Sequence, residues 1–158
     1  MPRLKVDLWK SSMDIQAYLI DTVGKRHDLL MTFDTGAYMT VIDSFVLSQA
    51  GYDTATGNDT IVDTVGHRGI PAKEVLLHGL ELEDINGACT SLGPVLVYAI
   101  DMSDTFTVGV LGLNVIREFI TEIRFGDPAT IELNPTFNIN EHVKFYDFNF
   151  FTSRFGLW

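Results

Sequence analysis

The tripeptide Asp34-Thr35-Gly36 is the part of the sequence best suited to chemistry. It lies in the stretch LLMTFDTGAYMTVID, where it ends one apolar run and a second apolar run begins directly after it. Hydrolysis of a peptide bond without a metal or a covalent nucleophile needs one group that takes a proton from water and another that gives a proton to the carbonyl oxygen. Two carboxylates that share a proton can do both, because close like charges cannot both ionise cheaply. The tripeptide occurs once, so the second carboxylate must come from elsewhere.

The same residues also fit an ordinary turn, in which Asp34 closes a strand and Gly36 supplies a positive φ angle. Two Asp-Thr-Val triplets, at Asp21 and Asp63, lack the glycine and fit turn and hairpin positions. Gly112, further along the chain, could simply let a helix pack closely. The order of several motifs along the chain must therefore decide between the two interpretations.

Alternation of apolar and polar residues is the dominant pattern of the sequence, and this pattern predicts β-strands. Strands must therefore position the Asp34 motif. The alternating apolar positions are Leu4, Val6 and Leu8 in a first run and Ile15, Ala17 and Leu19 in a second. A turn around Gly24 returns the chain into the strand LLMTF, so that Asp34 stands at a strand end. The pattern predicts a mainly β fold.

Further elements follow in order along the chain. Asp43 can cap a short helix, SFVLSQA, that Gly51 would end. The segment IVDTVGHRGIPAKEVLL predicts a long β-hairpin, and strands are expected around PVLVYAI and VGVLG. Val115, Ile116, Phe119 and Ile120 have helical spacing, so LNVIREFI predicts a helix. The segment TEIRFGDPATIEL predicts a hairpin that turns at residues 126–128.

The ordered set FDTGA, TVGHRGI and VLGLNVI resembles the retropepsin-like aspartic peptidases, the family of the retroviral proteases, over about Asp14 to Leu133. The resemblance implies a closed β-barrel with a flap hairpin and one or two short helices. It implies a single domain over residues 1–158, with an aromatic-rich C-terminal extension at about 136–158. The implied catalytic residues are Asp34, Thr35 and Gly36, and the implied substrate-binding residues are Ala37, Val65, Gly66, His67, Arg68, Gly69, Ile70 and Gly112.

The resemblance also implies a homodimer, in which Asp34 of each subunit meets its copy on the two-fold axis. Thr35 would hydrogen-bond to the partner's active-site loop, and the backbone at Gly36 would approach the aspartates or the substrate. Gly112 would support the active-site loop, with Val110 and Leu111 on the strand beneath it.

Residues 65–70 would form the flap, which closes over an extended substrate, excludes water and adds main-chain hydrogen bonds. A plain hairpin turn would also explain Gly66 and Gly69. His67 and Arg68 depart from the more neutral flap tips of retroviral members and would favour acidic side chains near the scissile bond.

Two other positions depart from the family pattern. Many relatives carry an acid shortly after the motif and an arginine next to the downstream glycine, and these two side chains pair within the subunit. Here the positions hold Tyr38 and Leu113. Their joint replacement is consistent, because losing one partner alone would leave a partly buried charge unpaired.

Composition limits the partners. The net charge of −10 repels a phosphate backbone or an anionic lipid surface, so we expect neither nucleic acid nor membrane as a partner. Cys89 is the only cysteine, and the start of the chain lacks a signal peptide pattern, so we expect a soluble, cytoplasmic protein. The four histidines, His27, His67, His78 and His142, lack ligand spacing, so we expect no metal and no cofactor.

The leading hypothesis is a homodimeric aspartic endopeptidase that cleaves extended, mainly apolar peptide segments. One alternative is a catalytically silent retropepsin-like module that binds peptides or supports assembly. Another is an unrelated all-β domain with an accidental motif. For the aromatic tail we expect packing on the partner subunit, and the alternative is an inhibitor that lies in the cleft.

We predict that activity is highest at mildly acidic pH. Ala37 has no hydroxyl, whereas a serine at this position could donate a hydrogen bond that stabilises the ionised carboxylate. Peptide hydrolysis measured as a function of pH tests this expectation. A maximum below about pH 3 would contradict it, because the paired acids would then need a pKa-lowering partner that the sequence does not identify.

Overall fold

A computed structural model describes residues 2–9, 12–64 and 67–135, and these residues form 12 strands and two short helices. The strands are β1 (Arg3–Trp9), β2 (Ser12–Ile20), β3 (Arg26–Phe33), β4 (Val41–Asp43), β5 (Asp59–Thr64), β6 (His67–Leu77), β7 (Gly79–Glu83), β8 (Cys89–Ser91), β9 (Val95–Ile100), β10 (Gly109–Leu111), β11 (Phe119–Arg124) and β12 (Ala129–Pro135). The helices are α1 (Ser44–Gln49) and α2 (Leu113–Ile116). The prediction of a mainly β fold is confirmed.

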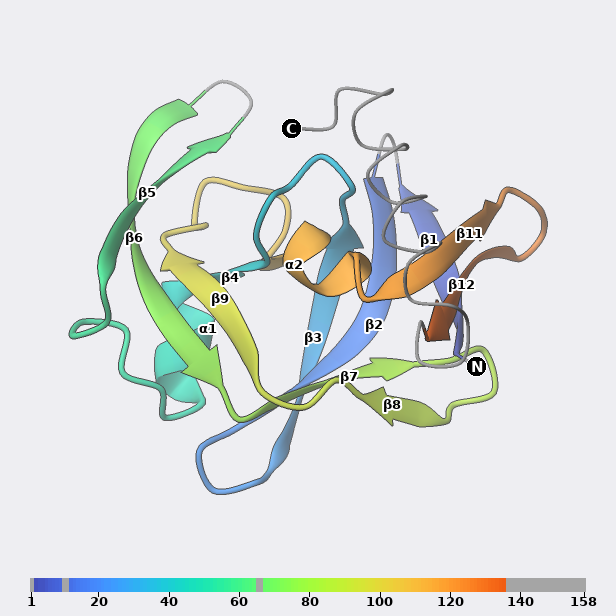
Figure 1. Cartoon of the computed structure of the whole chain (residues 1–158), viewed down its shortest axis with the longest axis horizontal. Helices are drawn as coiled ribbons and strands as arrows, with labels where there is room; N and C mark the ends of the chain where they lie inside the picture. Colours follow the sequence, from blue (N-terminus) through green and yellow to red (C-terminus); the bar gives the residue numbers. More distant parts are fainter. Residues whose placement is uncertain (1, 10–11, 65–66, 136–158) are drawn as a thin grey trace.

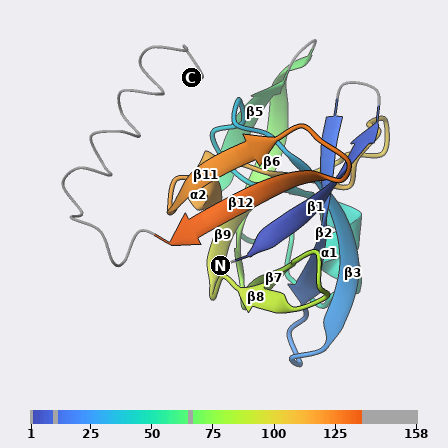
Figure 2. The same ribbon diagram turned by 90° about the vertical axis from the view of Figure 1, so that its right-hand side faces the viewer.

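The strands form one strongly curved sheet (Figure 1). Its order is β11-β12-β1-β2-β3-β10-β4-β9-β6-β5, and a branch leaves it through β7, which pairs with β2 and with β8. Within the described residues no backbone pairing joins β11 to β5, so hydrogen bonds do not close the sheet. The expected closed barrel is therefore not confirmed. Figure 2 shows β11, β12 and β1 side by side at one end of this order.

The core lies on the face of the sheet that the alternating apolar residues share. Ile15, Ala17 and Leu19 of β2 are all buried, as their period of two predicts. In β1 the same pattern holds for Leu4 and Val6, but Leu8 is exposed. Burial of this face holds β2 and β3 together and fixes the position where β3 ends.

Most of the predicted turns are confirmed. Gly24 has a φ of +88° in the turn between β2 and β3, and the chain turns between β11 and β12 around residues 126–128. The helix α1 follows Asp43 and ends just before Gly51, whose φ is +83°. Asp43 does not cap α1 with its side chain, because its Oδ1 accepts a hydrogen bond from the Met102 backbone N–H.

The helix predicted over LNVIREFI is only half correct. It ends at Ile116, and Phe119 and Ile120 belong to β11, which pairs with β12 from Phe119↔Pro135 onward. The apolar spacing suits either structure, and pairing with β12 decides for the strand. Sequence reasoning also missed the β7–β8 pair, which packs Leu80 and Leu82 into the core.

No helix within residues 2–9, 12–64 and 67–135 is long and apolar enough to cross a membrane.

The turn between β2 and β3 contains a buried carboxylate. Oδ1 of Asp21 accepts hydrogen bonds from the backbone N–H groups of Val23 (3.0 Å) and Lys25 (2.7 Å). Its Oδ2 lies 2.7 Å from Nε2 of His27. The hydrogen bond with His27 is the main cause that lowers the pKa of Asp21 below its ordinary value, and the two backbone donors add to it. The stabilisation of the ionised form outweighs the opposing effect of burial.

We predict that Asp21 makes stability depend on pH. Because the pKa of Asp21 is lower in the folded than in the unfolded chain, its stabilisation is complete above about pH 5 and is lost as the pH falls through the lowered value. Asp21→Asn should lower the thermal midpoint at neutral pH, and the difference from the wild type should shrink toward about pH 3. Circular dichroism melts across this range measure the effect. Asp7→Asn, at an exposed position of β1, is the control, and parallel pH profiles for wild type and Asp21→Asn would contradict the prediction.

Candidate active site

The loop of residues 34–40 connects β3 to β4 across the end of β10. β10 lies between the two strands, parallel to β3 (Leu111↔Phe33) and antiparallel to β4 (Val110↔Val41). In Figure 1 this loop stands beside α2 at the centre of the molecule. Val110 and Leu111 thus lie on the strand beneath the loop, as expected from the sequence.

Asp34 is exposed at the start of this loop. Its backbone N–H donates to the Leu111 carbonyl oxygen (3.1 Å), and its carboxylate Oδ1 accepts a hydrogen bond from the Gly36 N–H (2.8 Å). A Cβ at position 36 would lie only 3.1 Å from Oδ1. Gly36 is not among the glycines with positive φ, so this close approach, and not a left-handed turn, is what favours glycine here.

Thr35 and Ala37 follow the carboxylate and are half-buried. The Ala37 N–H donates to the Asp34 carbonyl oxygen (3.3 Å), which closes a short turn. Within the described part of the chain no residue accepts or donates a hydrogen bond at the Thr35 hydroxyl.

Gly112 touches the loop backbone directly. A Cβ built at Gly112 would lie 2.4 Å from the carbonyl carbon of Met39 and 2.8 Å from the backbone N of Thr40. Neither atom can move away without displacing the loop. The close approach therefore requires glycine at position 112, although its φ of −105° is available to any residue.

Thr40 and Asn114 form a hydrogen-bond network that sequence reasoning missed. Asn114 Oδ1 accepts from the Thr40 N–H (2.7 Å) and from the Thr40 hydroxyl (2.8 Å), and the hydroxyl accepts from the Gly112 N–H (3.1 Å). Asn114 Nδ2 donates to the Leu96 carbonyl oxygen (2.8 Å). The network joins the loop to α2 and β9. The signal that could have indicated this network from the sequence is the asparagine that follows Gly112 and Leu113.

Backbone bonds complete this support. The Leu113 N–H donates to the Ala37 carbonyl oxygen (2.8 Å), and the Asn114 N–H donates to the Tyr38 carbonyl oxygen (3.2 Å). The Leu113 side chain is buried in the core, whereas Tyr38 is exposed. Packing of Leu113 and neutral backbone hydrogen bonds thus connect this loop to α2.

The predicted flap corresponds to the hairpin of β5 and β6, which rises at the left of Figure 1 toward the same end of the molecule as the active-site loop. Val65 and Gly66 lie outside the described residues. His67, Arg68 and Gly69 are exposed, and Gly69 has a φ of +69°. The Gly69 N–H donates to Asp63 Oδ1 (2.8 Å), so that this aspartate orders the hairpin near its tip.

A second apolar cluster links this hairpin to the strand under Asp34. Its buried members are Val41, Ala72, Ile100 and Met102, and the partly buried side chains packed against it are Val62, Ile70, Tyr98 and Val110. Ile70 comes from the hairpin and Val110 from β10, so the structure brings these two predicted positions into one cluster.

Comparisons with known proteins support the fold and go no further. No protein-family model and no curated protein sequence matches the chain. Its structure is similar to that of a retropepsin-like aspartic protease from Rickettsia conorii, with a TM-score of 0.57 and 13% sequence identity over 83% of this chain and 87% of that one. The chain has a retropepsin-like fold. The expected fold type is thus confirmed, whereas the roles of the individual site residues stay predictions.

The part of the chain described shows no cluster of side chains suited to bind a metal ion. Within residues 2–9, 12–64 and 67–135, no group of three or more histidine, cysteine, aspartate or glutamate side chains is arranged to hold a metal ion. In the same residues, the carboxylate of Asp34 is hydrogen-bonded only to the Gly36 N–H. Among the described residues, no second carboxyl group is in hydrogen-bond contact with the Asp34 carboxylate.

We predict that Gly112→Ala destabilises the protein by about 1–3 kcal/mol or more, because a methyl group would overlap with backbone atoms of the loop. Gly126→Ala is the matched control, since a Cβ there would meet its nearest atom, the Pro128 carbonyl oxygen, at an ordinary 3.7 Å. Urea unfolding of both variants measures the difference. Equal free energies of unfolding for the two variants would show that the loop does not depend on this contact.

Proposed function

We propose that the chain is a homodimeric aspartic endopeptidase and that Asp34 of each subunit supplies one of two paired carboxylates. The observation that carries this proposal is the placement of Asp34. It is exposed at the end of β3, on a loop that Gly112 and Asn114 support from the other side through their contacts with Thr40. A fold similar to that of an aspartic protease adds weight to it.

The reaction follows from the shared proton. The ionised Asp34 takes a proton from water, whose oxygen attacks the peptide carbonyl carbon, while the protonated Asp34 of the other subunit gives its proton to the carbonyl oxygen. When the carbon–nitrogen bond breaks, the nitrogen takes the proton that Asp34 removed from water and leaves as an amine, and a hydroxyl of the tetrahedral intermediate gives its proton to the other carboxylate. The products are a carboxylic acid and an amine, and the two carboxyl groups again share one proton.

Two features support a two-fold dimer. The Thr35 hydroxyl, free of hydrogen bonds to the described residues, can bond to the loop of the partner. β11 pairs on one side only, with β12, among the strands described. An unpaired edge can accept a strand from a second copy.

The hairpin of β5 and β6 supports an extended peptide as substrate. A peptide between this hairpin and the loop could add main-chain hydrogen bonds to the strands, as in strand addition. The apolar cluster around Ile70 and Val110 favours apolar side chains. The exposed His67 and Arg68 near the hairpin tip favour an acidic residue in part of the substrate.

We predict that Asp34→Asn lowers the hydrolysis of denatured casein at least 100-fold, the order of magnitude expected for loss of general acid–base catalysis. Asp28→Asn is the control, because Asp28 is an exposed carboxylate on the same strand, β3. Equal activity of the wild type and Asp34→Asn would remove the peptidase proposal and leave a peptide-binding module as the alternative.

Mixing the two proteins tests whether the active site is shared. If each dimer needs both Asp34 residues, an equal mixture that has exchanged subunits keeps about a quarter of the wild-type activity, whereas independent sites would keep about half. Sedimentation at micromolar concentration gives the assembly state of the same samples. A single-chain mass with and without a peptide-like inhibitor would contradict the paired site.

A further inference from the structure

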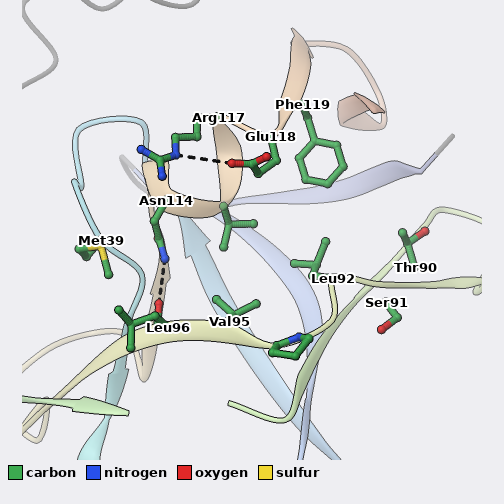
Figure 3. Close-up of a pocket in the computed structure, with 12 residues that line it drawn as sticks. Met39, Thr90, Ser91, Leu92, Val95, Leu96, Asn114, Arg117, Glu118 and Phe119 are labelled. Carbon is green, nitrogen blue, oxygen red and sulfur yellow. Dashed lines mark hydrogen bonds and ion pairs between the residues drawn. The ribbon is translucent and has the colours of Figure 1, made fainter. Parts of the chain in front are cut away.

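A pocket of about 600 Å³ lies between α2, the start of β11, β8 and β9 (Figure 3). Its apolar wall includes Leu92, Pro94, Val95, Leu96, Val115 and Phe119. The volume falls within the range of about 300–1,000 Å³ that is usual for ligand pockets. The wall is only partly covered by the described chain, since the Leu96 side chain is 41% exposed.

The C-terminal segment of the chain starts at the edge of this pocket. β12 ends at Pro135, which pairs with Phe119, and Phe119 itself lines the pocket. Residues 136–158 lie outside the described residues, and their sequence is rich in aromatic side chains. These are Phe137, Phe145, Tyr146, Phe148, Phe150, Phe151, Phe155 and Trp158.

We propose that the C-terminal segment of the same chain docks in this pocket, with Phe137 as its first anchor. Phe137 follows Pro135 by two residues, a reach of about 7 Å along an extended chain. Because Pro135 pairs with Phe119, a residue of the pocket wall, this reach is enough to bring Phe137 to the pocket. The pocket supplies the apolar contacts that a phenylalanine in water lacks.

The short distance from Pro135 to the pocket favours docking of the segment in its own chain, whereas the sequence led us to expect packing on the partner subunit. A segment that starts beside its pocket needs to order only a few residues to reach it, so loop closure costs little. A segment from another subunit reaches the pocket only after the two chains associate. Docking in the same chain therefore does not depend on the proposed dimer or on peptidase activity.

Docking would also affect the active-site loop. Asn114 lines the pocket and binds both the Thr40 side chain of the loop and the Leu96 backbone of the pocket wall, as the dashed line in Figure 3 marks for Leu96. A ring packed against this wall restricts the motion of Asn114. The segment thus acts as a brace that steadies residues 34–40 from behind.

Cross-linking tests the location of the segment. In a Cys89→Ser chain, which has no native thiol, Ser91→Cys places one thiol on the pocket wall and Asn138→Cys places another just past Phe137. The control pair, Asp63→Cys with Asn138→Cys, places the first thiol on the β5–β6 hairpin instead. In a glutathione redox buffer we expect the pocket pair to form a disulfide within one chain several-fold faster than the control pair. The same result is expected in an Asp34→Asn background, so a failure of the proposed function would not affect this outcome.

Three results would overturn the docking proposal. The first is an equal rate of disulfide formation for both cysteine pairs, and the second is faster formation by the hairpin pair, which indicates a segment in the cleft. The third is disulfides formed only between chains, which indicates that the segment packs on the partner subunit. A second measurement uses the full-length chain without added thiols. Phe137→Ala should shift the methyl NMR signals of Val95 and Val115 and increase hydrogen exchange in residues 34–40, and the control Phe155→Ala should do neither. Unchanged methyl signals in Phe137→Ala would show that Phe137 does not anchor the segment in the pocket.

Discussion

The contact between Gly112 and the backbone of Met39 and Thr40 is the constraint on which the rest of the site depends. It places the start of α2 against the loop that carries Asp34, at a distance that excludes even a methyl group. Once the two segments are this close, the hydrogen bonds from Leu113 and Asn114 to the loop carbonyls follow from the geometry. The two ends of the loop are then fixed by the pairing of β10 with β3 and β4, and the Asp34 backbone N–H donates to the Leu111 carbonyl oxygen of β10.

The side chains around this contact are neutral. Thr40 and Asn114 hydrogen-bond to each other. The Thr40 hydroxyl also accepts from the Gly112 N–H, and the Asn114 amide donates to the Leu96 carbonyl oxygen, so these polar groups near the buried contact all have partners. A neutral network avoids the desolvation penalty of a buried ion pair. The network itself adds no fixed charge to the loop that carries Asp34.

The features that could be predicted from the sequence are those that depend on residues close together in the chain. Alternation in β2 and the glycine turn at Gly24 each depend on a few neighbouring residues, and the structure shows both as expected. Asp34 also follows the end of β3, as the apolar run before it predicts. Features that depend on distant partners were not predictable. Phe119 looks helical until β12 pairs with it, and Thr40 gives no sign of Asn114, because the two residues meet only through the arrangement of β10 between β3 and β4.

The parallel pairing of β3 with β10 has a consequence for the time at which the protein can act. β2 and β3 are neighbours in the sequence and can pair early, whereas β10 is made much later and its pairing is non-local. A chain still on the ribosome that ends before Gly112 carries Asp34 at a loose strand end without its support. Asp34 is thus synthesised well before the residues that position it, and chain order alone delays assembly of the site until β10 and α2 have been made.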